Sequence, residues 1–174
     1  REQFNIFGAK PSQLKKTKFK SEMKKYFTKA GVPVAPGQIV KSEKDIAKAV
    51  KKIGFPMIAK PDNGVGASGT FKLMKKADLD GFKEAWDGKT AYFFEKFIDT
   101  NTLVTYDGLV DSKGNVVFET SLAYVHTPLE LLLSKKDNAY FIEKELDPKL
   151  VEYGRAVIKA FGMKERFFHI EFFK

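Results

Sequence analysis

Apolar residues recur at the spacing of an α-helix in four stretches of this chain. Between Thr17 and Ala30 they fall three or four positions apart, and Gly31 follows as a helix stop. A second stretch starts at Ser42, which has an aspartate three positions later as in a capped helix start, and stops at Gly54. The helices that this spacing predicts are residues 17–30, 42–53, 77–86 and 150–161.

Shorter stretches alternate between apolar and polar residues, or are rich in apolar and aromatic residues, as strands are. Two of them are joined by a turn at residues 111–115 and two by a glycine-rich loop, so both pairs are expected to be antiparallel. The order of elements predicts antiparallel sheets with helices packed on one face, which is an α+β fold. Residues 127–148 have mixed polarity, and we assign no element there. The expected strands are residues 38–40, 55–60, 70–74, 92–98, 102–110, 116–125 and 166–174.

The composition argues against several kinds of site. The chain of 174 residues has no cysteine and only two histidines, which excludes disulfides and cysteine-ligated metals and argues against a multi-histidine site. Oxygen ligands, and with them magnesium-type chemistry, stay open. No apolar run approaches the roughly 18 to 20 residues that cross a bilayer. The lack of cysteine is compatible with a reducing cytoplasm, and the first residue, Arg1, indicates a fragment or a processed product.

The net charge of +9 is concentrated in the first third of the chain. Residues 1–60 hold 15 Lys and Arg against four Asp and Glu, whereas residues 61–174 hold 16 against 18. This asymmetry favours attraction for polyanions such as nucleotides or nucleic acid. Helix periodicity explains most of the lysines equally well, as the solvated faces of amphipathic helices.

The stretch from Gly64 to Gly69 matches the pattern G-x-G-x-x-G, which several kinds of nucleotide site share. A dinucleotide fold requires the loop to open a helix, whereas residues 70–74 alternate as a strand. A Walker loop ends in Gly-Lys-Ser/Thr, and a protein kinase has its lysine on a strand after the loop. Here Lys60 precedes the loop, so these three readings fail and an ordinary flexible hairpin loop remains the alternative.

Two observations favour a phosphate-binding loop over an ordinary one. Lys60 ends an apolar strand, where a cation is costly unless it has an anionic partner. Glycines let backbone N–H groups approach phosphate oxygens, and Ser68 adds a hydroxyl group.

Together with other pieces of the chain, this loop resembles the ATP-grasp superfamily of ligases, over roughly Lys18 to Lys174. Within that superfamily the chain looks most like carbamoyl-phosphate-synthase-type and other carboxylate–amine ligases. The motifs that carry the resemblance are Lys20 with Ala-Gly-Val-Pro-Val-Ala-Pro at 30–36, Gly-Phe-Pro-Met-Ile-Ala-Lys-Pro at 54–61, Phe-Glu-Lys-Phe-Ile at 94–98 and Phe-His-Ile-Glu at 168–171.

The resemblance implies that ATP lies between two antiparallel-sheet subdomains with packed helices. Lys20 and Lys60 would bind its phosphates, the glycine-rich loop would close over them, and Glu95 would accept a hydrogen bond from the adenine amino group. Glu171 would coordinate Mg²⁺, and Asp107 is the nearest carboxylate for the ribose, where many family members have a glutamate. The remaining residues implied in nucleotide binding are Gly64, Gly66, Ser68 and Gly69 of the loop, and Lys96, Phe97 and Ile98 at the adenine edge.

The implied chemistry is attack of a carboxylate on the γ-phosphate of ATP, which gives an acylphosphate that an amine or another nucleophile captures. No catalytic residue is assigned. The expected partners are ATP and an unidentified carboxylate substrate; neither nucleic acid nor a membrane is expected, and a homodimer is left open. The alternatives are an ATP-binding module without catalysis and, less favoured, a basic nucleic-acid-binding domain.

The same resemblance divides the chain into three parts. Residues 1–16 would be a linker or the end of a preceding lobe, and residues 17–98 a lid subdomain that carries the glycine-rich loop. Residues 99–174 would be the incomplete start of a second subdomain, because the family's second metal carboxylate is expected beyond Lys174.

Overall fold

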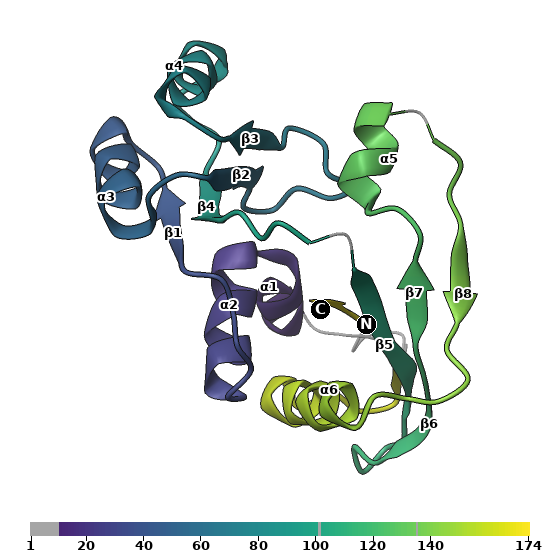
Figure 1. Ribbon diagram of the computed structural model, residues 1–174. Coiled ribbons are helices and arrows are strands. Elements are labelled where there is room, and N and C mark those ends of the chain that lie inside the picture. The colour runs from purple at the N-terminus through teal and green to yellow at the C-terminus, as the bar shows by residue number, and fades with distance from the viewer. Residues whose placement is uncertain (1–10, 101, 135) are drawn as a thin grey trace.

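The computed structural model describes residues 11–100, 102–134 and 136–174. Their strands form two antiparallel sheets, each with helices against it, and helices α1 and α2 lie between the sheets (Figure 1). The expected linker over residues 1–16 falls mostly on residues 1–10, outside the described residues. The described remainder of that range belongs to helix α1, which spans Pro11–Lys18. No helix in the described ranges is both long and apolar enough to cross a membrane.

The first sheet has the strand order β1-β4-β2-β3. Helices α3 and α4 cover one of its faces, and the buried core between them contains Met57 and Ala59 from β2 and Phe82 from α4. Every second residue of β2 and β4 therefore points into this core, and the residues between them point to the opposite face. The elements of this part are β1 (Gly37–Val40), α3 (Glu43–Ile53), β2 (Met57–Pro61), β3 (Phe71–Leu73), α4 (Lys76–Ala85) and β4 (Tyr92–Lys96).

The helix predicted from Ser42 begins and ends as its sequence indicates. The Ser42 side chain accepts a hydrogen bond from the Asp45 backbone N–H, which caps α3, and Gly54 follows the last turn with a positive φ of 66°. The expected hairpin also forms, because β2 and β3 pair as antiparallel neighbours on either side of the glycine-rich loop.

The second sheet is built around β5, which pairs with β6 and β7 on one side and with β9 on the other. One face is covered by α6, whose buried residues include Leu150, Val157 and Phe161. The elements of this part are β5 (Leu103–Val110), β6 (Val116–Thr120), β7 (Leu122–Tyr124), α5 (Pro128–Ser134), β8 (Tyr140–Ile142), α6 (Pro148–Phe161) and β9 (Arg166–Phe173).

Three details differ from the expectations. The strand expected over residues 116–125 is interrupted at buried Ser121, so that β6 and β7 are separate. Residues 127–148, which received no element, contain α5 and the edge strand β8. The helix expected over residues 17–30 is α2 (Lys20–Lys29), with α1 directly before it.

Helix α2, expected in the lid subdomain, packs its apolar side on the core of the second sheet. The rings of Tyr26 and Phe27 lie 4.9 and 5.5 Å from the ring of Phe161 on α6, measured between ring centroids. Its polar side reaches the first sheet, as described below, so α2 connects the two sheets physically.

Candidate functional site

Lys60 and Glu95 lie on the face of the first sheet that α3 and α4 leave uncovered. Their neighbours Ala59 and Phe94 are buried in the core on the other face, and successive strand residues alternate between faces. The register of β2 against β4 pairs Ile58 with Glu95, so Lys60 is two positions along the same face and within reach of the carboxylate.

The Glu95 carboxylate holds two ammonium groups. Lys60 donates to its Oε1 and Lys24, on α2, donates to its Oε2, both at 2.7 Å. The Glu95 side chain is only 15% exposed. Burial by itself would raise the pKa of Glu95, but the charges and hydrogen bonds of Lys60 and Lys24 outweigh it, and the pKa is lowered. The anionic partner expected for Lys60 is therefore present within the chain itself.

Lys20 points into the start of the glycine-rich loop. Its Nζ donates to the carbonyl oxygens of Pro61 and Gly64, at 2.8 and 2.7 Å. Burial first, and then the nearby charge of Lys60, lower the pKa of the Lys20 ammonium below its ordinary value. Two lysines that lie far apart in the sequence thus converge on the same end of the loop.

Asp62 fixes the start of α2 against this loop. Its carboxylate is buried and accepts hydrogen bonds from both the backbone N–H and the hydroxyl of Ser21, each at 2.8 Å. Its carbonyl oxygen accepts from the backbone N–H of Lys20 at 2.9 Å. The position of Lys20 relative to the loop is thereby set by backbone and side-chain contacts together.

The loop needs glycine at several of its positions. A Cβ at Gly64 would lie 2.9 Å from the Cβ of Pro61, so a larger residue would crowd the loop entrance. Gly66 and Gly69 have φ angles of 63° and 67°, which L-residues rarely adopt. Ser68 is exposed on the loop, as expected for a hydroxyl that meets a ligand.

The residues expected at the adenine edge follow Glu95. The backbone N–H groups of Lys96 and Phe97 donate to the carbonyl oxygens of Pro36 and Pro56. These two N–H groups are therefore engaged within the chain, and a base edge at this position would meet Ile98 or backbone carbonyls. The Phe97 ring lies beneath the Lys72 ammonium, 5.3 Å from its centroid, and Ile98 is exposed.

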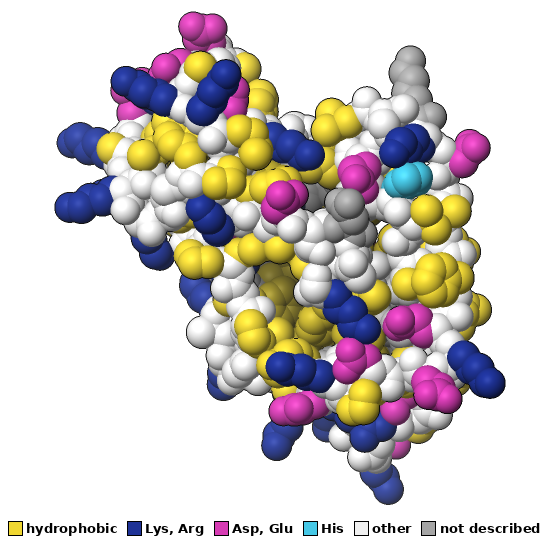
Figure 2. Space-filling view, in the orientation of Figure 1, with side chains coloured by type: hydrophobic (Ala, Val, Ile, Leu, Met, Phe, Trp, Pro, Cys, Tyr) yellow, Lys and Arg dark blue, Asp and Glu magenta, His cyan; other side chains and the backbone are white. Residues whose placement is uncertain are grey.

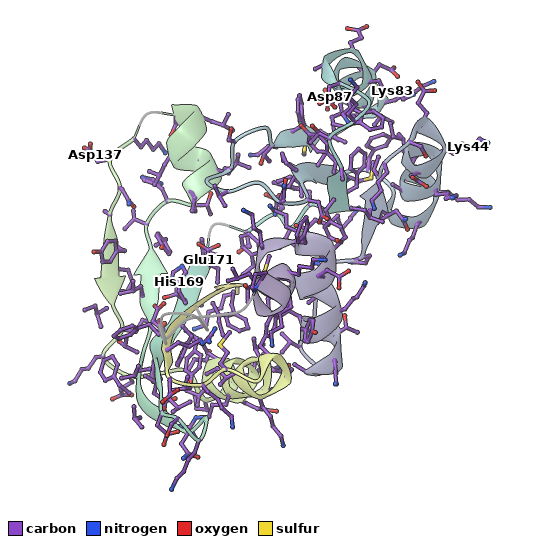
Figure 3. The ribbon with its side chains drawn as sticks, turned by 180° about the vertical axis from the view of Figure 1, so that it is seen from behind. Lys44, Lys83, Asp87, Asp137, His169 and Glu171 are labelled. Carbon is purple, nitrogen blue, oxygen red and sulfur yellow. The ribbon has the colours of Figure 1, made fainter. Side chains whose placement is uncertain are left out.

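Asp107 and Glu171 belong to the second sheet. His169 Nδ1 lies 2.6 Å from Asp107 Oδ1, and the Thr105 hydroxyl donates to the other Asp107 oxygen. His169 Nε2 lies 3.8 Å from Glu171 Oε1, and Figure 3 shows these two side chains next to each other on β9. Because Asp107 pairs with His169 and Thr105 with Glu171 across β5 and β9, all four lie on the face opposite α6.

The expected residues therefore fall into two groups. The first group lies on the first sheet, where Lys20 contacts the loop and Lys60 contacts Glu95. The second group lies on the second sheet, where His169 lies between Asp107 and Glu171. Among the described residues, no ion pair joins the two groups. In Figure 2 the surface is indented between the lobe with α3 and α4 and the lobe with α5, and hydrophobic and charged side chains meet there.

The donor groups fit the two expected ligands unequally. The ammonium groups and the glycine positions of the first sheet suit a polyphosphate. For magnesium, the described part of the chain contains no group of three or more His, Asp or Glu residues that could hold a metal ion. These residues alone do not make a magnesium site, and Glu171 would contribute a single carboxylate to one.

Lys24, Ser21 and Asp62 were missed by the sequence reasoning. Lys24 lies four residues after Lys20, one helix turn away on the same face, which was a usable signal. For Asp62, which directly follows Lys60-Pro61, no sequence signal indicated a buried partner.

A cavity of about 240 Å³ lies elsewhere in the molecule, between α1, the C-terminal end of α6 and β9. Its lining includes Lys16, Arg166 and His169, but not Lys20, Lys24 or Lys60.

Two comparisons of sequence find relatives of the chain. The family model described as "Carbamoyl-phosphate synthase L chain, ATP binding domain" matches residues 16–127. A biotin carboxylase from Nostoc sp. is 30% identical over 122 residues, which cover 64% of this chain and 27% of that protein. The chain thus spans much less than half the length of this curated relative.

Comparison of structures finds the same fold at low sequence identity. N5-carboxyaminoimidazole synthetase from Staphylococcus aureus, complexed with ADP, has a TM-score of 0.75 at 21% identity, over 90% of this chain and 40% of that one. D-alanyl-alanine synthetase A from Vibrio cholerae has a TM-score of 0.74 at 15% identity, over 99% of this chain and 56% of that one. The expected ATP-grasp fold, of α+β class, is confirmed.

Proposed function

We propose that this chain, which belongs to the family of the carbamoyl-phosphate synthase L chain ATP-binding domain, is the ATP-binding part of an ATP-dependent ligase. The single observation that carries the proposal is the meeting of Lys20 and Lys60 at the entrance of the glycine-rich loop. The similarity to a biotin carboxylase supports it, as does the shared fold with a synthetase that was solved with ADP.

On this proposal, the phosphates of ATP bind at the entrance of the loop. Lys20 and Lys60 donate to the phosphate oxygens and neutralise part of their charge, and backbone N–H groups between Gly64 and Gly69 add further donors. Phosphate oxygens would replace the Pro61 and Gly64 carbonyls around Lys20 and the carboxylate around Lys60. Positioning and charge neutralisation are what phosphoryl transfer chiefly requires of a protein.

The base is placed by the residues at the end of β4. The Glu95 carboxylate accepts a hydrogen bond from the adenine amino group, and Phe97 and Ile98 line the ring. The neighbouring backbone carbonyls, with Ile98, supply the remaining edge contacts. Asp107 is our candidate for the ribose; because its two oxygens already meet Thr105 and His169, it would have to accept a third hydrogen bond.

The reaction that we propose for the whole protein has two steps. A carboxylate attacks the γ-phosphorus of ATP to form an acylphosphate and release ADP, and an amine or a similar nucleophile then attacks the acyl carbon and releases phosphate. ATP would supply the phosphoryl group. Mg²⁺ bound to the nucleotide would balance part of the negative charge of the phosphates. Glu171 is the one described carboxylate that we assign to the metal.

Thermal unfolding with and without ATP tests the nucleotide site. ATP at a hundred times its dissociation constant, with magnesium present, is expected to stabilise the chain by about 2.7 kcal/mol. In Lys60→Met the increase in the free energy of unfolding that ATP causes is expected to fall by at least half, because one of the phosphate-binding ammonium groups is gone. Each variant is compared with its own nucleotide-free state, so that a change in basal stability does not enter.

Lys44→Met is the matched control, because Lys44 is an exposed residue of α3, which covers the face of the first sheet opposite to Lys60 (Figure 3). It is expected to keep the full ATP-dependent increase. The proposed site is wrong if the unchanged chain shows no increase, or if Lys60→Met and Lys44→Met respond to ATP equally. Steeply salt-dependent binding to DNA without any response to ATP would instead favour a nucleic-acid-binding domain.

A further inference from the structure

Lys24 and Lys60 share the Glu95 carboxylate, but they come from different parts of the fold. Lys60 is on β2 beside the glycine-rich loop, whereas Lys24 is on α2, which is anchored to the second sheet by its apolar side. Each occupies its own oxygen, Lys60 on Oε1 and Lys24 on Oε2. The Lys24 ammonium also lies 5.7 Å from the centroid of the Phe93 ring, which helps to hold it in this position.

Because Lys24 and Lys60 occupy separate oxygens of Glu95, one of them can leave when an anion is bound. If the Lys60 ammonium turns to a phosphate, Glu95 loses one of its two counterions while its side chain stays largely enclosed, at 15% exposed. A partly buried carboxylate without a counterion is costly. Lys24 is itself only 21% exposed and remains on Oε2, so the carboxylate stays paired and held in one orientation.

The departure of Lys60 also changes what Oε1 can accept. With Lys60 in place, Oε1 already accepts a charge-assisted hydrogen bond at 2.7 Å. With Lys60 on a phosphate, Oε1 is released to accept a hydrogen bond from another donor. An exocyclic amino group matches this acceptor, whereas the carbonyl oxygen of guanine at the same position would meet a negative charge.

We propose that Lys24 is a positioning residue that holds Glu95 while Lys60 turns to the phosphates, and so links selection of an adenine base to binding of the phosphates. This inference rests on the proposed ATP site. It makes Glu95 Oε1 an acceptor that Lys60 and the adenine amino group use in turn. Recognition of the base and of the phosphates is then cooperative, because each makes the other less costly.

Titration of the chain with ATP and with GTP, monitored by calorimetry, tests this role. In Lys24→Met we expect the affinity for ATP to fall by about tenfold and the ratio of ATP to GTP affinity to fall with it, because Glu95 loses its permanent partner. Lys24→Arg is expected to restore most of the ratio, since it returns a cation to Oε2. Lys25→Met is the control: Lys25 is exposed on the same helix and pairs with Glu22, and both affinities should stay as in the unchanged chain.

A second background separates action through Glu95 from direct contact with the phosphates. In Glu95→Gln there is no carboxylate to hold, so adding Lys24→Met is expected to cause no further loss of ATP affinity. Circular dichroism of each variant establishes that the chain is folded before titration. Lys24→Gln replaces Lys24→Met if the latter does not fold.

Two results would overturn the inference alone: an unchanged ATP-to-GTP ratio in Lys24→Met, or the same loss of ATP affinity in the Glu95→Gln background. The second would mean that Lys24 binds the nucleotide directly. If the unchanged chain binds neither ATP nor GTP, the proposed function fails, and this inference fails with it.

Discussion

Glu95 and Lys60 are separated by 35 residues and meet because β2 and β4 run side by side. Their ion pair changes how the candidate site is understood. A lysine at the end of an apolar strand indicates a missing anion only if the chain does not supply one, and here it does. The convergence of Lys20 and Lys60 at the loop, together with the family, therefore supports a phosphate site, whereas Lys60 is not an unpaired cation.

Tyr106 provides a prediction at the scale of one residue. Its ring is buried and its hydroxyl donates to Glu119, which also pairs with Arg155. Burial, followed by the bond to Glu119, raises the Tyr106 pKa to about 12, from an ordinary value of 10.0. Because the folded pKa is the higher one, this contribution to stability is complete below the ordinary pKa and is lost as the pH rises toward the folded pKa.

We therefore expect Tyr106→Phe to lose less stability than the unchanged chain when the pH is raised across this window. The expected difference is up to roughly 2 to 3 kcal/mol in the free energy of unfolding, measured by urea denaturation at a series of alkaline pH values. Tyr140→Phe, at an exposed position of β8, is the matched control and should follow the unchanged chain. Parallel curves for Tyr106→Phe and the unchanged chain would contradict the prediction.

At the scale of elements, local signals were most useful where a helix or turn depends on its own residues. The cap at Ser42 and the stop at Gly54 were predicted because both act on neighbouring backbone groups. The break at Ser121 and the short elements α5 and β8 were not predicted. Edge strand β8 has three exposed residues, Tyr140 to Ile142, and a run of this length carries too little periodicity to identify a strand.

Gly154 gives a prediction for helix α6. A Cβ at this position would lie 2.0 Å from Cδ1 of the Tyr106 ring, where the helix packs against β5. Although alanine favours helices, we expect Gly154→Ala to lower the free energy of unfolding by about 1 to 3 kcal/mol because the buried ring cannot move away. Thermal and urea unfolding measure the change.

The control for this prediction is Gly81→Ala in α4, where an added Cβ would have no atom within 4 Å. There the helix preference of alanine acts alone, and the free energy of unfolding should rise by about 0.5 to 1 kcal/mol. If the two substitutions change stability in the same direction, close packing at Gly154 is not the controlling factor.

At the scale of the whole molecule, α2 is the element that joins the sheets. Its apolar side is partly buried and packs against α6, and its polar side holds the first sheet through Ser21, Lys20 and Lys24. Hydrogen bonds and the ion pair of Lys24 with Glu95 thus link α2 to the first sheet and its loop, whereas hydrophobic contacts link α2 to the second sheet. A ligand that competes for these lysines acts directly on the connection between the sheets.

Asp62→Ala tests this connection. Removal of the buried carboxylate leaves the Ser21 N–H and hydroxyl without their acceptor, and the free energy of unfolding is expected to fall by about 1 to 3 kcal/mol. ATP affinity is expected to fall as well, because Lys20 is no longer fixed against the loop. Asp80→Ala, at an exposed position of α4 whose carboxylate lies 4.0 Å from Lys83 Nζ, should change stability by less than about 0.5 kcal/mol. Equal effects of the two substitutions would contradict the role of Asp62.

Most of the elements could be predicted from local sequence patterns, as could the antiparallel hairpin around the glycine-rich loop, the α+β class and the ATP-grasp family. Periodicity, caps and turns depend on residues close together in the chain, and the family motifs are likewise short. The roles of the individual site residues toward ATP and magnesium stay predictions.

Which side chains meet depends, in contrast, on how distant parts of the chain pack together. Lys24 and Glu95 are 71 residues apart, Ser21 and Asp62 are 41 apart, and Asp107 and His169 are 62 apart. No local pattern encodes such pairs, because each depends on strand register and on where α2 packs. The glycine-rich loop was visible in the sequence, but the carboxylate that holds its lysine, and the second lysine that shares this carboxylate, became visible only when the sheets and α2 were in place.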